Sequence, residues 1–451
     1  MAKRTTLYVC QQCGTSFSKW AGKCDNCGAW NSLVEEAKQL EKKAVVDRST
    51  GKVLSGEKIA DVHVEALGTR LATGFAQLDE VLGGGLMPGG VALLAGQPGI
   101  GKSTLLLQLV LFVGASEPVL YVSGEESAGQ VKLRAERLSK SLPENVTLIA
   151  TTSADDIAAT IATGTYRLVI VDSMQTVAMA EVASAPGTVS QITNSANTVI
   201  RAAKASNTAV VLVGHVTKEG SIAGPKVLEH LVDVVLQFEG DRYGGFKLLR
   251  AAKNRYGSTA EVAILEMDGE GLKEVENASA SLLSERGKSD GSVVLATMEG
   301  NRPLLVEIQA LVNPTHFGYP KRTASGFDLN RLTLLIAVLE KRTKLNLSDK
   351  DIFINVVGGL RLVDPAADLA VCMAVASAAA ERTLADDLVV FGEVGLGGEV
   401  RRVGSIELRV KEAKKLGFKH AIAPMSKDGG TFVSPVSDLR DALNLHLTKN
   451  N

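Results

Sequence analysis

The sequence of 451 residues has almost no net charge, no long hydrophobic run and few cysteines. Its 49 basic and 50 acidic side chains give a formal net charge of −1, so the overall charge neither favours nor excludes a polyanionic partner. Any contact with nucleic acid must therefore come from local patches. The length predicts two or three domains rather than one.

No uninterrupted apolar run approaches the roughly 18 residues needed to cross a bilayer. The first residues, MAKRTTLYVCQQC, lack the continuous apolar core of a secretory signal. We therefore expect a cytoplasmic protein with no membrane partner.

Of the five cysteines, four lie near the start of the chain, in two C-x₂-C pairs that are each followed by a glycine. In a reducing compartment this spacing indicates metal ligands rather than disulfides. Four thiolates suit a tetrahedral structural Zn²⁺, and the glycines leave room for backbone N–H groups to approach sulfur. The predicted ligands are Cys10, Cys13, Cys24 and Cys27. The fifth, Cys372, lies in an apolar stretch and is expected in the core.

The cysteine segment also contains both tryptophans, Trp20 and Trp30. Basic side chains outnumber acidic ones in it, but four thiolates around one zinc ion would return two negative charges. A weakly basic face remains, which is compatible either with DNA or with a protein docking surface.

Composition divides the chain into four stretches. Residues 1–33 are the predicted zinc module, and residues 34–60 are charged and poor in large apolar groups, as a solvated linker is. From 61–278, short β-branched runs alternate with helix-like segments, which is typical of a mainly parallel sheet covered on both faces. A polar stretch marks a boundary, and a second α/β region occupies 288–451.

One phosphate-binding motif, G-x-x-x-x-G-K-[ST], follows the strand VALLA and opens the helix STLLLQLVL. Its glycines would let backbone N–H groups and the helix N-terminus face the phosphates of a nucleotide. Lys102 would neutralise β- and γ-phosphate charge, and Ser103 would offer its hydroxyl to Mg²⁺. The sequence therefore predicts ATP and Mg²⁺, bound by Gly96, Gln97, Pro98, Gly99, Ile100, Gly101, Lys102, Ser103 and Thr104.

Polar residues end three further strands of this region. Asp172 ends LVIVD, where a carboxylate can hold the magnesium shell or can cap the next helix. Glu125 and Glu126 follow LYVSG, and either is a candidate general base or a helix cap. His215 ends AVVLVGH, where it would be a γ-phosphate sensor or a structural histidine.

The order of these motifs, from GQPGIGKST through GEES, VDS and GH to KNRYG, resembles the RecA-like ATPases. Together with the cysteine module and the C-terminal region, the whole chain is similar to the bacterial RadA (Sms) family. In RecA-like rings the nucleotide lies between subunits, and basic residues of a neighbour reach its γ-phosphate. The resemblance implies this catalytic role for Lys253 and Arg255, which alternate on an extended segment at a predicted hairpin turn. The open alternative is a solvent-exposed basic turn.

The C-terminal region resembles the proteolytic domain of Lon, through VNPT, GFDLNRLTLLIAVLEKR, NVVGGLRLVDPAADLAV and GEVGLGGEVRRVGS. Lon cleaves with a serine–lysine dyad, and these positions fall near Ala366 and Arg409. Alanine is no nucleophile and arginine stays protonated, so we expect no protease. Ser405 and Lys411 are nearby but out of register. A basic helix within 401–420 would be either a solvated face or a contact for phosphate backbones.

The resemblance also implies where DNA runs. Segments 179–191 and 217–230 would line the channel of a ring as mobile loops, in which Lys218 and Lys226 would either contact phosphates or be ordinary surface lysines. The implied function is a DNA-dependent ATPase and helicase of recombination and repair. It would act as a hexameric ring on single-stranded and branched DNA, beside the RecA recombinase. The alternative is a signalling ATPase similar to KaiC, which switches protein partners without moving on DNA.

Overall fold

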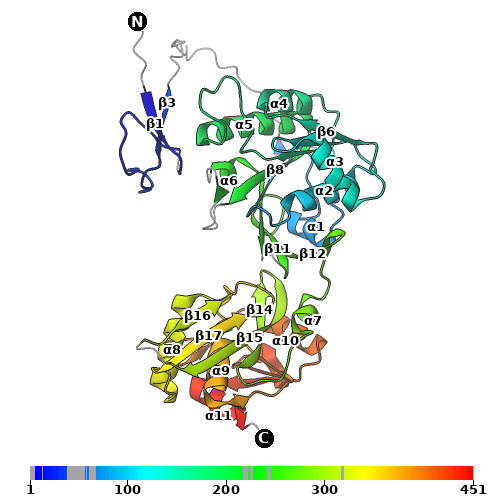
Figure 1. Cartoon of the computed structure of the whole chain (residues 1–451). Coiled ribbons are helices and arrows are strands. Elements are labelled where there is room, and N and C mark those ends of the chain that lie inside the picture. Colours follow the sequence, from blue (N-terminus) through cyan, green and yellow to red (C-terminus); the bar gives the residue numbers. More distant parts are fainter. Residues whose placement is uncertain are drawn as a thin grey trace. The chain divides into compact units, whose positions relative to one another are not determined.

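The computed structural model describes residues 6–12, 14–37, 56, 58–59, 68–216, 222–223, 227–240, 245–315 and 319–449. The chain forms two compact units. The first contains residues 1–239, 248–259 and 267–274, and the second contains 240–247, 260–266 and 275–451. Figure 1 shows the helices and strands of each unit, coloured along the sequence.

The N-terminal module is a small antiparallel sheet of three strands, in the order β2-β1-β3. Its strands are β1 (Thr6–Cys10), β2 (Ser16–Phe17) and β3 (Leu33–Ala37). The buried residues are Cys10, Cys24 and Leu33, with Tyr8 and Phe17 packed against them. Because this core is so small, a bound metal would have to supply most of the folding free energy.

The main sheet has ten strands in the order β13-β12-β11-β10-β4-β8-β7-β5-β6, and β9 pairs with β8. Within this order, β10, β4, β8, β7, β5 and β6 pair with one another in parallel. Every residue of β4 and β5 is buried, as expected for a parallel sheet covered on both faces. The strands are β4 (Val91–Gly96), β5 (Val119–Ser123), β6 (Val146–Ala150), β7 (Leu168–Asp172), β8 (Ala209–Val216), β9 (Ile222–Ala223), β10 (Val234–Gly240), β11 (Lys247–Asn254), β12 (Val262–Asp268) and β13 (Gly271–Glu274).

Amphipathic helices cover this sheet, and α4 packs against α5 while α2 packs against α3 (Figure 1). Side chains fix where three of them begin: Ser127, Ser153 and Thr188 each accept a hydrogen bond from the backbone N–H three residues later. The helices are α1 (Ala76–Leu82), α2 (Lys102–Val113), α3 (Ala128–Leu138), α4 (Ala154–Ala162), α5 (Val189–Ser206) and α6 (Val227–Leu231).

The second unit is built on a sheet of seven strands, in the order β16-β17-β15-β14-β19-β22-β23. Its central helix α9 is buried from Ala367 to Ser377, and Cys372 within it is fully buried, as predicted. The helices are α7 (Ala278–Leu283), α8 (Leu329–Thr343), α9 (Ala367–Ala380), α10 (Ile406–Lys415) and α11 (Leu439–His446). The strands of the sheet are β14 (Ser292–Glu299), β15 (Arg302–Pro314), β16 (Arg322–Ser325), β17 (Lys350–Val356), β19 (Leu388–Val390), β22 (His420–Pro424) and β23 (Val433–Val436).

Short elements complete this unit: two strand pairs, β18 (Arg382–Thr383) with β24 (Thr448–Lys449) and β20 (Glu393–Val394) with β21 (Val400–Arg401), and a 3₁₀ segment (Lys427–Phe432). The polar stretch that was expected to be a plain boundary begins with α7, which packs on β15. Ser279 anchors it: its buried hydroxyl donates to Glu412 and accepts from the N–H of Leu305. Among the described residues, every helix is too short or too polar to span a bilayer.

Candidate nucleotide site and metal centre

The phosphate loop connects the end of β4 to the start of α2, as its motif requires. Gly99 and Gly101 have φ values of +79° and +115°, which are strained for any residue with a side chain. At Gly96 an added Cβ would lie 2.7 Å from the carbonyl oxygen of Phe238 on the neighbouring strand. The loop therefore needs its glycines for backbone conformation and for close packing against β10.

Lys102 begins α2 and is only 5% exposed. Its Nζ donates to the carbonyl oxygens of Gly96 at 2.8 Å and Gln97 at 3.1 Å, so the ammonium lies inside the curve of the loop. Burial lowers the pKa of Lys102, while the carboxylates of Asp172 and Glu125 act in the opposite direction. The side chain is thus a desolvated cation that faces two acidic groups.

Ser103 and Asp172 meet across the sheet edge. The Ser103 hydroxyl donates to Oδ2 of Asp172 at 2.8 Å, and the hydroxyl of Tyr121 donates to the same oxygen at 2.7 Å. Burial, followed by the Asp172 charge, raises the pKa of Tyr121 well above its ordinary value. A hydroxyl and a carboxylate oxygen are ligand types that Mg²⁺ accepts, so this pair fits the predicted magnesium shell.

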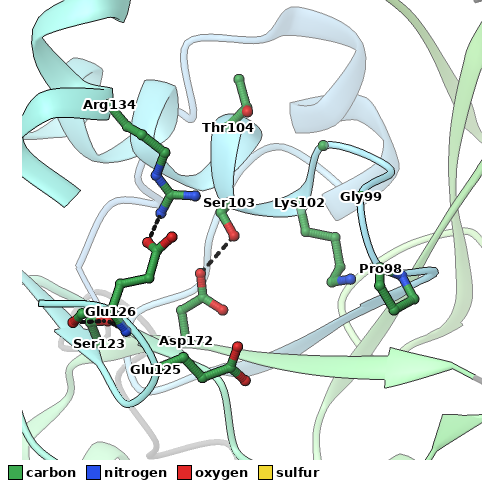
Figure 2. A pocket seen from close by; sticks show the side chains of 11 residues that line it. Pro98, Gly99, Lys102, Ser103, Thr104, Ser123, Glu125, Glu126, Arg134 and Asp172 are labelled. Carbon is green, nitrogen blue, oxygen red and sulfur yellow. Dashed lines mark hydrogen bonds and ion pairs between the residues drawn. The ribbon is translucent and has the colours of Figure 1, made fainter. Parts of the chain in front are cut away.

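The acidic pair after β5 lies at the same edge, because Ser123 of β5 is in register with Asp172 of β7. Glu125 accepts a hydrogen bond from the hydroxyl of Ser173, whereas Glu126 forms an ion pair with Arg134 of α3. Both glutamates line a cavity of about 360 Å³ (Figure 2). Its lining residues are Pro98, Gly99, Gly101, Lys102, Ser103, Thr104, Ser123, Glu125, Glu126, Arg134 and Asp172.

Most predicted cofactor residues thus gather in one cavity, and Arg134 is a member that the sequence reasoning missed. Its position in the sequence could have predicted this, because two turns of α3 place Arg134 on the same side of the helix as the acidic pair that precedes it. For the predicted sensor His215, the structure gives the backbone alone, in register with Gly96 on the adjacent strand. Its side chain lies outside the described residues.

Lys253 lies near the end of β11, at the predicted turn between β11 and β12. Its Nζ donates to the carbonyl oxygens of Glu229 at 2.8 Å and Val232 at 2.7 Å, and more weakly to His230 at 3.4 Å. Glu229 and His230 belong to α6, and Val232 directly follows it. In the single protomer the ammonium therefore caps a helix C-terminus, where a cation is favourable.

Arg255 forms an ion pair with Asp233, at 2.9 Å between Nη1 and Oδ1. Asp233 is a buried carboxylate whose second oxygen accepts the backbone N–H of Val91, at 3.1 Å. Tyr256 completes the group: burial, the Asp233 charge and a hydrogen bond to it raise the pKa of this phenol to about 12. The sequence reasoning missed Asp233, whose only signal is a charged residue directly before a buried strand.

The basic pair lies near the amino ends of the parallel strands, whereas the phosphate loop lies at their carboxyl ends. Val91, which binds Asp233, starts β4, and Gly96, which starts the loop, ends it. Six residues of β-strand span about 16 to 20 Å, which exceeds the reach of an arginine side chain. Lys253 and Arg255 therefore cannot contact a nucleotide bound by their own phosphate loop.

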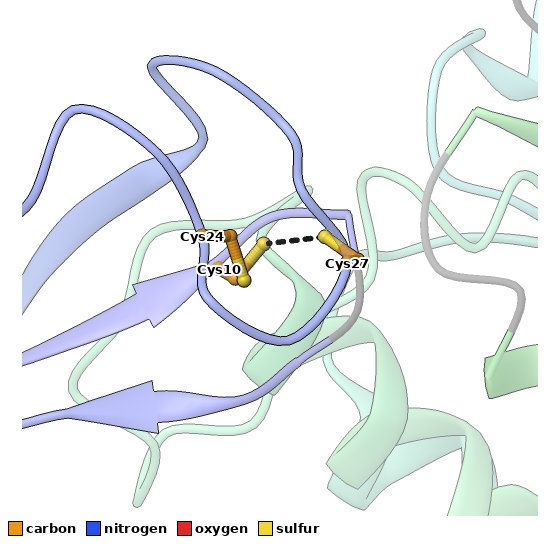
Figure 3. Close-up of side chains that lie close together, drawn as sticks. All are labelled: Cys10, Cys24 and Cys27. Carbon is orange, nitrogen blue, oxygen red and sulfur yellow. Dashed lines mark hydrogen bonds between the residues drawn. The ribbon is translucent and has the colours of Figure 1, made fainter.

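Three of the four predicted zinc ligands are described, and their sulfur atoms lie within 4.8 Å of one another (Figure 3). They are Cys10, Cys24 and Cys27, and Cys13 lies outside the described residues. Gly14 and Gly28 have positive φ, and their N–H groups donate to the carbonyls of Cys10 and Cys24, both at 2.8 Å. Two such equivalent turns are the geometry of a pair of zinc knuckles.

An N–H group also approaches sulfur, as the glycines were expected to allow. The donor is the backbone N–H of Gln12, which lies 3.4 Å from the sulfur of Cys10. Such a bond orients a ligand and tunes its charge. The three thiols fit a structural zinc ion.

The segment after Asp172 was expected to be a mobile loop, and this is wrong for its first part. The side chain of Gln191 is buried, and its amide donates to the carbonyls of Met179, Val182 and Ser184, each at 3.1 Å. Its oxygen accepts the N–H of Met179, also at 3.1 Å. One glutamine at the start of α5 therefore fixes this loop. Lys218 and Lys226, in the second predicted loop, lie outside the described residues.

The positions that would hold a protease dyad are buried in the second unit. Ala366 is fully buried, and Arg409 is 2% exposed. Arg409 forms an ion pair with Asp364 at 2.7 Å and donates to the carbonyl of Ala296 at 2.6 Å. This arginine is a structural cation, and neither Ala366 nor Arg409 offers a nucleophile or a base.

The burial of Arg409 also corrects the predicted basic helix. Of the cations around α10, Arg409 points into the core, Arg401 pairs with Glu399 at 2.6 Å, and Lys419 pairs with Asp387 at 3.2 Å. The helix thus offers fewer free charges than its sequence implied.

Comparison with known proteins adds the family. The DNA repair protein RadA of Pseudomonas aeruginosa is 48% identical over 451 residues, which cover 98% of this chain and 99% of that protein. Proteins of the same name from Aquifex aeolicus and Bacillus subtilis are 46% identical, over 446 and 458 residues, and cover 98% and 99% of this chain. The chain belongs to the RadA family. The resemblance stated from the motifs is thereby confirmed.

Family models match three parts of this RadA-family chain. A rubredoxin metal-binding domain matches residues 8–35, an AAA domain matches 60–221, and the ChlI subunit of Mg-chelatase matches 333–427. The predicted α/β architecture, with a zinc module, a RecA-like core and a Lon-like C-terminal region, is confirmed. A solved RadB recombinase covers 46% of the chain at 24% identity, with a TM-score of 0.37.

Proposed function

We propose that the chain hydrolyses ATP in the cavity between the phosphate loop and the strand-end acids. The observation that carries this proposal is the convergence of Lys102, Ser103, Asp172 and Glu125 on one cavity. Lys102 would leave the loop carbonyls for the β- and γ-phosphates, since a phosphate offers its ammonium a full negative charge. Thr104 would bind phosphate at the helix N-terminus.

Ser103 and Asp172 would hold Mg²⁺, which neutralises phosphate charge when bound. Their 2.8 Å hydrogen bond keeps both oxygens at the cavity wall, where such an ion would bind. Cys10, Cys13, Cys24 and Cys27 would hold a structural zinc ion.

Of the two acids after β5, we assign the general base to Glu125. Glu126 is engaged by Arg134, and a carboxylate paired with a guanidinium is a weaker base. Glu125 accepts a hydrogen bond from the neutral hydroxyl of Ser173, and it lies close enough to Lys102 to influence the pKa of that amine. Such a position suits a group that orients the attacking water. His215 would sense the γ-phosphate from the adjacent strand.

The catalytic cations of the KNRYG segment would act on the nucleotide of a neighbouring protomer. Support comes from their position near the amino ends of the parallel strands. A nucleotide bound by their own phosphate loop, at the carboxyl ends, is out of their reach. Lys253 would exchange the carbonyls of α6, and Arg255 the carboxylate of Asp233, for a γ-phosphate across the seam. Hydrolysis would then require a ring, which we propose to be a hexamer.

For the whole protein we propose a DNA-dependent ATPase and helicase of homologous recombination and repair, in the cytoplasm. It would move on single-stranded DNA and promote branch migration of RecA strand-exchange intermediates. The support is that relatives matched over nearly their full length carry the name DNA repair protein RadA. The proposed boundaries remain 1–33, 34–60, 61–278 and 288–451.

The test measures ATP turnover, and strand displacement on forked DNA, for the wild type, Lys102→Ala and a control, Lys132→Ala. Lys132 is an exposed lysine of α3 that pairs with Glu136 on its own helix. We expect single-stranded DNA to stimulate turnover and Lys102→Ala to lower it about 100-fold or more, since one charge-stabilising group is typically worth that much. The Lys132→Ala variant should match the wild type.

Two outcomes would redirect the proposal. ATP turnover that depends on Lys102 but ignores DNA would favour the KaiC-like signalling alternative. Full turnover by Lys102→Ala would contradict the assigned site itself.

A further inference from the structure

Both tryptophans of the chain lie on the surface of the zinc module. Trp20 is 58% exposed and Trp30 is 73% exposed. The core of the module consists of Cys10, Cys24 and Leu33, with Tyr8 and Phe17 against them, and neither tryptophan belongs to it. A module this short of apolar groups would be more stable with its two largest rings buried. Their exposure therefore points to a partner.

The two rings lie on neighbouring segments. Lys23 and Trp30 form an isolated antiparallel bridge, and the ammonium of Lys23 lies 5.6 Å from the centre of the Trp30 ring. The Trp20 ring lies over Gly22, where an added Cβ would come within 3.9 Å of it. Trp20, Gly22, Lys23 and Trp30 are therefore neighbours on the module, with a cation beside the Trp30 ring.

We propose that this surface, Trp20 and Trp30 with Lys19 and Lys23, stacks on unpaired bases of single-stranded DNA. Exposed indole rings beside cations are the elements of sequence-tolerant single-strand binding, in which rings stack on bases and lysines meet phosphates. The proposal rests on the proposed action on DNA and deepens it by naming the part of the chain that holds the strand.

The surrounding side chains favour a nucleic acid over a protein partner. Lys19 and Asn31 are next to the tryptophans in sequence, Lys23 lies beside the Trp30 ring, and all three are exposed, so donors that suit phosphates and bases accompany the rings. Asp25 and Glu35 are exposed as well, so the module is not a general cationic patch. Stacking must therefore supply most of the affinity. Each lysine that neutralises a phosphate steepens the plot of log affinity against log salt concentration by only about 0.7 for single-stranded DNA.

The test uses the full chain and its tryptophan fluorescence, excited at the long-wavelength edge where the six tyrosines absorb little, because both tryptophans lie in this module. Titration with an unlabelled thymidine oligonucleotide should quench the emission, since indole rings stack on the bases. Quenching by double-stranded DNA of the same length should be much weaker, because its bases are already stacked. Unchanged emission with single-stranded DNA would overturn the proposal.

Variants measure the contribution of each ring through the anisotropy of a labelled oligonucleotide. Trp30→Ala and Trp20→Ala should each weaken binding about 5-fold or more, the fold-change of one lost stacking contact. Trp30→Phe should retain most of the affinity, because a smaller ring still stacks. Bound zinc, measured for every variant, separates a lost contact from a lost fold.

The outcomes distinguish this surface from the proposed function. Alanine variants that bind DNA with wild-type affinity and keep DNA-stimulated ATP turnover would refute the surface and leave the function intact. Emission that responds to a protein partner and not to DNA would refute it in favour of protein docking. Failure of the proposed function would instead appear as turnover that does not depend on Lys102.

Discussion

At the scale of single residues, one buried carboxylate links the KNRYG segment to the strand that ends in the phosphate loop. Asp233 accepts the N–H of Val91 at the start of β4, and it pairs with Arg255 and with Lys204. Burial acts to raise the pKa of Asp233, but the backbone hydrogen bond and the two cations outweigh it. The pKa lies below the ordinary value of 3.8.

This lowered pKa sets a pH dependence. A carboxyl whose folded pKa is depressed stabilises the fold above its unfolded pKa, and that stability is lost as pH falls through the folded value. We expect Asp233→Asn to cost about 1–3 kcal/mol near neutral pH, as loss of a partner by buried polar groups does. The urea midpoint of the variant should also fall less steeply than that of the wild type between pH 5 and pH 3.

The control is Asp290→Asn, which replaces an exposed carboxylate. It should follow the wild type at every pH. If the urea midpoints of Asp233→Asn and the wild type fell equally steeply at acid pH, Asp233 would not titrate as its contacts require.

Residues within a motif could be predicted from the sequence, but residues elsewhere that bind the motif side chains could not. Lys102, Ser103 and Asp172 line one cavity because their spacing and strand ends fix their positions in any fold of this class. Arg134 and Asp233 were missed because their partners, Glu126 and Arg255, are brought to them by tertiary packing. No local pattern records that packing.

At the scale of elements, sequence and structure agree most closely where strands are buried. The run VALLAG was expected as a strand and forms β4, because a β-branched and leucine-rich run between glycines leaves little choice. The loop after Asp172 was misjudged because small residues suggest mobility, whereas one buried glutamine, Gln191, holds it through four hydrogen bonds.

The KNRYG turn is itself held by packing against the end of α1. Gly83 follows that helix with a φ of +82°, and an added Cβ would lie 2.7 Å from the carbonyl oxygen of Tyr256 and 3.1 Å from Cα of Gly257. Asn254 donates to the carbonyl of Val81 at 3.0 Å. The position of the basic pair therefore depends on this glycine.

We expect Gly83→Ala to destabilise the chain by about 1–3 kcal/mol, the cost of a strained backbone position. It should also reduce ATP turnover, because the turn that presents Lys253 and Arg255 must shift. The control is Gly269→Ala, whose added methyl would meet nothing within 4 Å. Urea unfolding and steady-state turnover measure both effects, and equal values for the two variants would contradict this role.

At the scale of the whole molecule, the separation of loop and basic pair decides how the protein works. A protomer carries the phosphate loop at the carboxyl ends of its parallel strands and the KNRYG cations near their amino ends. On the proposed function, each half would complete a site with the other half of a neighbour. The sequence contains both motifs but cannot show that they face opposite edges, because that follows from strand order and direction.

The most direct test of this arrangement mixes two inactive variants in one ring. Lys102→Ala lacks the phosphate grip but keeps the KNRYG cations, and Arg255→Ala keeps the phosphate grip but lacks one of the two cations. Each alone should be nearly inactive. Rings co-expressed from equal amounts of both variants should regain turnover toward about a quarter of wild type. With random assembly, about a quarter of the interfaces combine an intact phosphate loop from one protomer with an intact KNRYG segment from the next. Turnover no higher than the mean of the two parents would contradict a nucleotide site shared between protomers.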